Sequence, residues 1–284
     1  MRLRLFLLFL MISDQTLAQE KIPVFVTILP QKYFVEQIGK ELVKVSVLVQ
    51  PAKSAETYEP TPRQMTDFNQ AKLYFSIGMP FEEIWLPKLK ENNPHTRFVD
   101  AREKITLRKL EDFHSDDHEH GLFDPHIWLN PTLVEIMATQ IEKHLSELNP
   151  ENAPIFRANA AQFIQQLKQL DQNIRLIFRD LKQRKFMVFH PAWGYFADQY
   201  QLQQIPIEIE GKETGSKTLG LLLEKAKQEN ISTIFVQKQL NQRPAQSIAK
   251  AINAQVITVD PLAENYIENL YQVAQLLAKA MQSP

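Results

Sequence analysis

The chain has 284 residues, 44% of them hydrophobic and 23% charged, which is the composition of one large or two ordinary globular domains rather than of a disordered chain. Its 32 basic and 33 acidic residues give a formal net charge of -1, and no basic stripe with interleaved aromatic residues is present, which argues against a nucleic-acid partner. Because the chain has no cysteine, disulfide bonds, cysteine-ligated zinc and a lipid anchor on a cysteine are excluded, and a metal site would need His, Asp, Glu or carbonyl ligands.

The N-terminus has the pattern of an export signal. Arg2 and Arg4 precede the short apolar run 5–12, and the residues up to Ala18 offer a small-residue cleavage site. The run is shorter than the roughly 20 residues that span a bilayer. We therefore predict a signal peptide over residues 1–18, cleaved near Ala18, and a periplasmic protein; a buried N-terminal strand is the alternative.

Short strand-like runs alternate with helical patterns through the first half of the chain. Strands are expected over residues 21–28, 43–49, 73–77 and 96–100, and helices after Pro30 and over residues 62–70 and 81–91. This alternation is typical of a parallel sheet that is covered by helices on both faces. We predict an N-terminal α/β lobe over residues 19–148.

A long helical segment follows. Residues 152–183 contain no glycine, and Pro154 stands where a helix would begin, a position at which its missing N–H costs little. About 30 helical residues would extend roughly 45 Å, enough to cross a two-lobed molecule. We predict one connecting helix within residues 149–184; two helices with a break are the alternative.

The last part of the chain repeats the first pattern. Strands are expected over residues 185–190, 205–209, 233–236 and 255–259, and the intervening and final segments read as helices. The segments VTILPQKYF and VFHPAWGYF both run from a strand through a proline into aromatic residues. We predict a C-terminal α/β lobe over residues 185–284, and a cleft between the carboxyl ends of the two sheets, where open α/β sheets bind ligands.

Three residues that can bind a metal stand at the ends of predicted elements. His190 ends the strand KFMVFH, Asp260 ends AQVITVD, and His126 lies in the turn DPHIWLNP. Each could instead have a purely structural role: the histidines could be hydrogen-bonded to a backbone carbonyl, and the aspartate could cap a turn. Together, imidazole and carboxylate groups suit zinc, manganese or iron.

Seven segments, in order, resemble one known family: ILPQKYFVEQIG, TYEPTPRQM, DPHIWLNP, FHPAWGYFADQY, IEIEGKE, IFVQKQLN and VDPLAENYIENL. They are similar to the solute-binding proteins of metal-importing ABC transporters, the zinc/manganese group called cluster A-I. The resemblance covers essentially the whole mature chain. It implies two (β/α) lobes joined by a long helix, one divalent ion held by four side chains between them, and delivery of that ion to a membrane permease.

The resemblance also implies the ligands. By position, the second ligand of the family falls on His126, the third on His190 and the acidic fourth on Asp260. The third position is histidine in typical zinc members and glutamate in typical manganese members. The chain departs from the family at the first ligand, because Glu56 stands where a histidine is expected, two residues before Tyr58.

The identity of the metal depends on Glu56. If Glu56 is a ligand, two nitrogens and two oxygens form the shell, and its two carboxylates neutralise a divalent cation, which favours burial. Zn²⁺ is then the predicted ion, with Mn²⁺ or Fe²⁺ as the alternative, because oxygen ligands reduce the preference for zinc without reversing it. If Glu56 points away, the site has three protein ligands or is completed by water.

The polar segment HSDDHEH, residues 114–120, precedes His126. His114, His118 and His120 could capture metal weakly on the approach to the site, as the resemblance to zinc-type members implies; a solvated acidic loop is the alternative. Tight binding by this segment alone is not expected, because ordering a mobile chain costs about 1 to 2 kcal/mol per residue. We expect His95 at the surface and His144 on a helix face.

The predicted function is therefore that of a monomeric, non-enzymatic carrier that binds a divalent metal and passes it to an ABC permease. The long helix argues for small motions on release rather than wide hinge bending. A metal-dependent hydrolase is the first alternative, and it would need an open coordination position that holds water. An adhesin or surface-binding module is the second.

Overall fold

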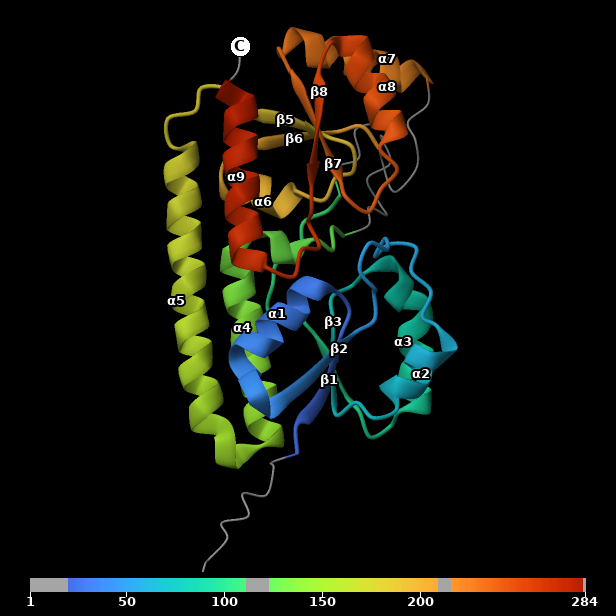
Figure 1. Ribbon diagram of the computed structural model, residues 1–284, viewed down its shortest axis with the longest axis vertical. Coiled ribbons are helices and arrows are strands. Elements are labelled where there is room, and N and C mark those ends of the chain that lie inside the picture. Colours follow the sequence, from blue (N-terminus) through green and yellow to red (C-terminus); the bar gives the residue numbers. More distant parts are fainter. Residues whose placement is uncertain (1–19, 111–122, 209–215, 283–284) are drawn as a thin grey trace, which may run out of the picture.

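The computed structural model describes residues 20–110, 123–208 and 216–282 (Figure 1). The predicted signal peptide and the histidine-rich segment 114–120 lie outside these residues. Within the described ranges, no helix is both long enough and apolar enough to cross a bilayer.

The first lobe is built on a parallel four-stranded sheet with the strand order β2-β1-β3-β4. Its strands and helices are β1 (Ile22–Val26), α1 (Leu29–Gly39), β2 (Val43–Val47), α2 (Pro62–Phe68), β3 (Leu73–Ser76), α3 (Pro80–Asn92) and β4 (Arg97–Asp100). Every residue of the inner strand β3 is buried, as expected for a parallel strand covered on both faces. The strand predicted over residues 43–49 ends at Val47, where the chain begins the loop that leads to α2.

The second lobe repeats this topology in the order β6-β5-β7-β8, again with all strands parallel. Its elements are β5 (Lys185–Val188), α6 (Gly194–Gln199), β6 (Gln203–Pro206), α7 (Ser216–Gln228), β7 (Thr233–Gln237), α8 (Arg243–Ile252), β8 (Gln255–Val259) and α9 (Tyr266–Gln282). The strand predicted over residues 205–209 starts two residues earlier and ends at Pro206. The prediction of two α/β lobes with parallel sheets is confirmed.

A helical hairpin connects the lobes. Helix α4 (Pro131–Leu148) is capped by Asn130, whose side chain accepts a hydrogen bond from the Thr132 N–H. A short 3-10 turn then leads into α5 (Ala153–Phe178). The single long helix is confirmed, although it ends at Phe178 and its 26 residues extend about 39 Å. The sequence patterns did not single out α4 as a separate helix.

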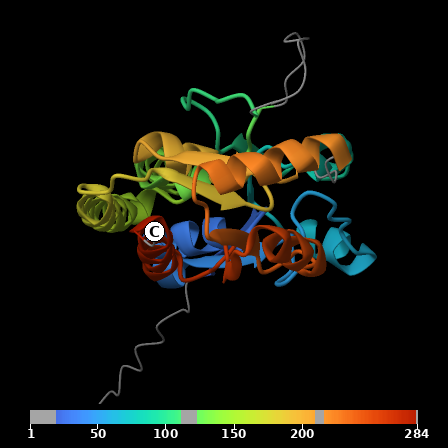
Figure 2. The ribbon, with the colours of Figure 1, turned by 90° about the horizontal axis from the view of Figure 1, so that it is seen from above.

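Helix α5 packs along the side of both lobes. Its buried residues recur at intervals of three or four, so one stripe contacts α4, α1 and α9. Figures 1 and 2 show α5 beside α9 on one side of the molecule. One apolar core runs from the first sheet through α4, α5 and α9 to β5, and a smaller core lies between the second sheet and α7 and α8.

Hydrogen bonds near the cleft also tie the lobes together. Trp128 Nε1 donates to the Pro261 carbonyl at 2.8 Å, and the Tyr266 hydroxyl donates to the Trp128 carbonyl at 2.7 Å. Trp128 belongs to the 3-10 turn Ile127–Leu129 between the sheets. This turn therefore connects the start of α4 to the β8–α9 loop, and it carries His126 immediately before it.

Candidate metal centre

Three of the four predicted ligands come together between the lobes. Glu56 lies on the loop between β2 and α2, His126 just before the turn Ile127–Leu129, and His190 two residues after β5. One potential ligand atom from each residue lies within 4.8 Å of the others, and this is the single group of its kind in the part of the chain that the structure describes. Three distant segments thus contribute to one site.

The geometry of this group suits a single ion. His190 Nε2 lies 2.6 Å from Glu56 Oε1, and the ring centroids of His126 and His190 are 5.4 Å apart. Both histidines are buried, and the Glu56 side chain is 26% exposed. The cavity lined by these three residues, which we call the metal cavity, has a volume of about 20 Å³ and also contacts Trp128 and Gln239. An organic ligand would not fit this space.

Asp124 orients His126. The imidazole Nδ1 and the backbone N–H of His126 both donate to Asp124 Oδ1, at 2.7 Å and 2.9 Å. Since the carboxylate accepts from Nδ1, Nε2 is left as the nitrogen available to bind a metal. Asp124 is fully buried; burial alone would raise its pKa, but the bonds from His126 and the nearby Arg108 guanidinium lower it below its usual value.

Glu208 orients His190 in the same way. Strands β5 and β6 pair in parallel with Val188 opposite Pro206, so the residues two positions further, His190 and Glu208, lie beside each other. His190 Nδ1 donates to Glu208 Oε1 at 2.7 Å. This bond leaves His190 Nε2 directed at Glu56 and the metal cavity.

His190 is held between two carboxylates. Burial would lower its pKa, but the hydrogen bonds to Glu208 and Glu56 outweigh burial and raise the pKa from 6.5 to about 9. Burial would likewise raise the pKa of Glu56, but His190 lowers it. In this form of the protein, a proton on His190 Nε2 therefore occupies the position that a metal ion would take, and binding must displace it.

Neither orienting carboxylate, Asp124 nor Glu208, was predicted as a functional residue from the sequence. Asp124 could have been found from its position two residues before His126 in DPHIW, since a short turn brings i and i+2 side chains together. Glu208 could be found only with the strand pairing, because 17 residues separate it from His190. Histidine ligands of metals commonly donate their second nitrogen to such a carboxylate.

Asp260, the fourth predicted ligand, lies outside this group. Its Oδ1 accepts hydrogen bonds from Gln239 Nε2 at 2.6 Å and from the Leu262 N–H at 3.0 Å. It lines a separate cavity of about 240 Å³ between the lobes, together with Lys53, Lys238 and Gln239. We call this space the inter-lobe cavity. The structure therefore leaves Asp260 out of the three-residue group but bonds it to Gln239, which lines the metal cavity.

The remaining histidines do not join the site. His114, His118 and His120 lie outside the described residues. His95 is exposed, as predicted, with Nε2 2.8 Å from the Asn69 carbonyl, and His144 lies on α4.

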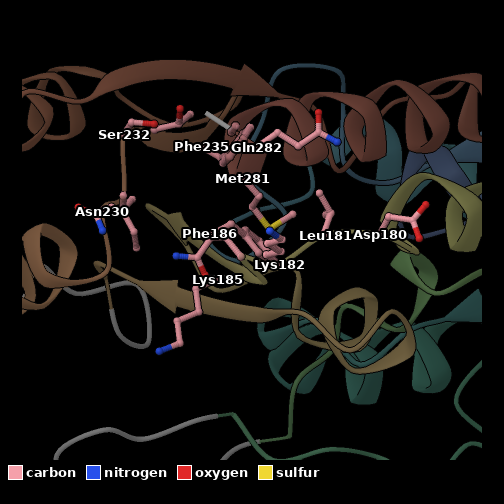
Figure 3. Close-up of a pocket in the computed structure, with 14 residues that line it drawn as sticks. Asp180, Leu181, Lys182, Lys185, Phe186, Asn230, Ser232, Phe235, Met281 and Gln282 are labelled. Atoms are coloured by element: carbon pink, nitrogen blue, oxygen red, sulfur yellow. Dashed lines mark hydrogen bonds between the residues drawn. The ribbon is translucent and has the colours of Figure 1, made fainter. Parts of the chain in front are cut away.

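A further cavity of about 400 Å³ lies at the end of the second sheet that is opposite to the metal cavity (Figure 3). It is lined by Lys185 and Phe186 at the start of β5, by Ser232 just before β7, and by Met281 and Gln282 at the end of α9. None of the four predicted ligands contributes to it. The candidate metal site lies at the carboxyl end of the sheet, where open α/β folds bind ligands, and this cavity is at the amino end.

Comparisons with known proteins identify the family. The family model described as "Zinc-uptake complex component A periplasmic" (ZnuA) matches residues 24–280. The chain is 27% identical over 257 residues to the high-affinity zinc uptake system protein ZnuA of Bacillus subtilis (strain 168), with 86% of this chain and 79% of that protein covered. It is also 27% identical to the zinc-binding protein AdcA of Streptococcus pyogenes serotype M3, but it spans only 52% of that longer protein.

Solved structures of ZnuA also match this chain. A crystal structure of ZnuA superposes with a TM-score of 0.87 at 42% sequence identity, covering 93% of this chain and all of the other. A zinc-bound deletion mutant of ZnuA matches with the same values. A laminin-binding protein of Streptococcus agalactiae, described as having adhesin and metal-transporting activity, shares the fold alone at 23% identity. The family match runs through both lobes and includes the positions of Glu56, His126 and His190, so the chain belongs to the ZnuA family of periplasmic zinc-uptake components.

Proposed function

We propose that this protein is the periplasmic zinc carrier of an ABC importer: it binds Zn²⁺ as cargo and delivers it to a membrane permease. The observation that carries the proposal is the convergence of Glu56, His126 and His190 on one ion-sized cavity. The names of its relatives as zinc uptake and zinc-binding proteins support the same cargo. The role is transport rather than catalysis.

In this proposal, zinc is held by His126 Nε2, His190 Nε2 and a carboxylate oxygen of Glu56. Asp260 becomes the fourth ligand when its carboxylate turns away from Gln239. Two imidazoles and two carboxylates give a neutral, tetrahedral zinc site. Zinc is favoured over manganese because nitrogen donors and the general order of divalent affinities both act in that direction.

Each step in loading belongs to a residue of this chain. Asp124 and Glu208 keep the two imidazoles in the orientation that presents Nε2 to the ion. His190 loses its Nε2 proton as zinc arrives, and Glu56 exchanges its hydrogen bond with His190 for a bond to the metal. The ion therefore replaces a proton that bridges the same two side chains.

A competition titration tests this function. Metal-stripped protein comprising residues 19–284 is titrated with Zn²⁺ and with Mn²⁺, beside Glu56→Gln and the control Glu59→Gln, a nearby glutamate that is exposed. We expect one tight zinc site, weaker manganese binding, and at least a roughly tenfold loss of zinc affinity in Glu56→Gln, because the uncharged amide is a poorer ligand. Glu59→Gln should bind like the wild type.

Two results would contradict the proposal. If the wild type binds zinc only weakly, the protein is not a zinc carrier. If Glu56→Gln binds zinc as tightly as the wild type does, Glu56 is a bystander and the three-residue cluster is not the ligand set.

A further inference from the structure

Gln239 contacts both the predicted fourth ligand and the cavity formed by the other three. It follows β7 by two residues and lines both the metal cavity, with Glu56, His126 and His190, and the inter-lobe cavity, with Asp260. Leu262 is shared by the two cavities as well. Gln239 thus lines the metal cavity and is also hydrogen-bonded to Asp260.

The amide of Gln239 is bonded on one side only. Its Nε2 donates to Asp260 Oδ1 at 2.6 Å, a short bond to a charged acceptor. Its Oε1 is buried and has no hydrogen-bond donor among the described residues. The bond to Asp260 is therefore the interaction that orients this amide, and it also orients the Asp260 carboxylate.

We propose that Gln239 is a positioning residue that holds Asp260 away from the three clustered side chains, so that the fourth ligand must break a hydrogen bond before it can reach zinc. This inference rests on the proposed function, in which Asp260 ligates the ion. A carrier must release its cargo as well as capture it. Because Gln239 competes with the ion for Asp260, Asp260 can leave the ion and return to Gln239. The ion is then held by three ligands, more weakly, and can be released.

The metal-free and loaded states differ in the hydrogen bonds that Asp260 makes. In the metal-free state, Asp260 accepts from both Gln239 and the Leu262 N–H; in the loaded state, it gives up the Gln239 bond. A hydrogen bond to a charged group corresponds to a factor of about ten or more in an equilibrium constant. Removing the donor from Gln239 should therefore tighten zinc binding, whereas removing a residue that merely lines a site would weaken it.

The test uses Gln239→Met, which keeps the length of the side chain without a donor, and Gln239→Ala as a second variant. The matched control is Gln242→Met, because Gln242 Nε2 donates to Thr258 Oγ1 at 3.0 Å and Gln242 does not line the metal cavity. We expect both Gln239 variants to bind Zn²⁺ roughly tenfold more tightly and to release it more slowly to an excess of chelator. Gln242→Met should match the wild type.

A double-mutant cycle separates positioning from a structural effect. In an Asp260→Ala background, Gln239→Met should leave the zinc affinity unchanged, because the residue that Gln239 restrains is absent. Bound Co²⁺ should show a more intense visible absorption band in Gln239→Met than in the wild type, as four-coordinate binding becomes more populated.

Failure of this inference is distinguishable from failure of the proposed function. If the wild type binds zinc tightly but Gln239→Met binds it equally or more weakly, Gln239 does not restrain Asp260, while the carrier role stands. An equal gain with and without Asp260 would also overturn the inference. If the wild type fails to bind zinc, the proposed function itself is wrong.

Discussion

At the scale of single residues, the site is defined as much by the partners of its ligands as by the ligands. Asp124 and Glu208 each accept from a histidine Nδ1, and each therefore fixes which imidazole nitrogen faces the metal cavity. Loss of such a partner typically costs about 10- to 100-fold in metal affinity. The two histidines thus depend on carboxylates that do not touch the ion.

The raised pKa of His190 predicts that zinc uptake is coupled to proton release. Because its pKa is about 9, His190 is protonated at pH 7 in the metal-free protein, and zinc must displace that proton. Zinc affinity should therefore increase as the pH rises through the neutral range and level off above about pH 9. Calorimetric titrations in buffers of different ionisation enthalpy at pH 7 should report about one proton released from His190 for each zinc bound.

Glu208→Gln is the informative variant for this coupling. Replacing the carboxylate removes one of the two groups that raise the pKa of His190, so the variant should release fewer protons at the same pH. Zinc binding by the wild type without proton release at pH 7 would show that His190 is neutral in the metal-free protein.

At the scale of elements, the start of α6 supports the His126 side of the site. Gly194 begins α6, and a Cβ there would lie 1.6 Å from Arg108 Nη1 and 2.6 Å from Asp124 Oδ2. Arg108 Nη1 is 3.3 Å from Asp124, and its Nε is 3.0 Å from Asp198 on the same helix. The glycine allows this guanidinium to pack against α6 and to contact the carboxylate that orients His126.

Gly194→Ala should therefore lower both stability and zinc affinity. The added methyl group would displace Arg108, and such overpacking typically costs about 1 to 3 kcal/mol in the free energy of unfolding. Denaturant unfolding and zinc titration measure the two effects. The control is Gly220→Ala on α7, where a Cβ meets nothing within 4 Å and alanine favours the helix. If Gly194→Ala is as stable as the wild type and binds zinc normally, Arg108 has no positioning role.

At the scale of the whole molecule, the two lobes are restrained against wide opening. One core extends across both through α5 and α9, and hydrogen bonds join Trp128 in the 3-10 turn to Pro261 in the β8–α9 loop and to Tyr266 at the start of α9. Breaking this packing would expose apolar surface, which is costly. Loading and release are therefore expected to involve side chains and loops near Asp260 rather than rotation of a lobe.

Small-angle X-ray scattering tests this expectation. The radius of gyration and the distance distribution of the metal-free and zinc-loaded protein should superimpose, since neither state separates the lobes. A clear contraction on loading, of the kind that domain closure around a ligand produces, would show that the shared core does not restrain the lobes.

Much of the architecture was predictable from local patterns. Alternating apolar strands and helices identify two parallel α/β units, and a glycine-free segment after Pro154 identifies the long helix, because these signals depend only on residues close together in the chain. Local patterns placed His144 on a helix without giving the bounds of α4, and they misplaced the ends of β2 and β6, since helix and strand ends depend on what packs against them.

The candidate metal site was likewise predictable in part. The sequence by itself determined that His126, His190, Asp260 and Glu56 were candidates, from their places at the ends of elements and from the family resemblance. Only the tertiary structure decided that Glu56 meets His190, that Glu208 lies beside it, and that Asp260 is bonded to Gln239. The physical reason is that these contacts join segments distant in sequence, so their geometry follows from strand register and lobe packing rather than from any local pattern.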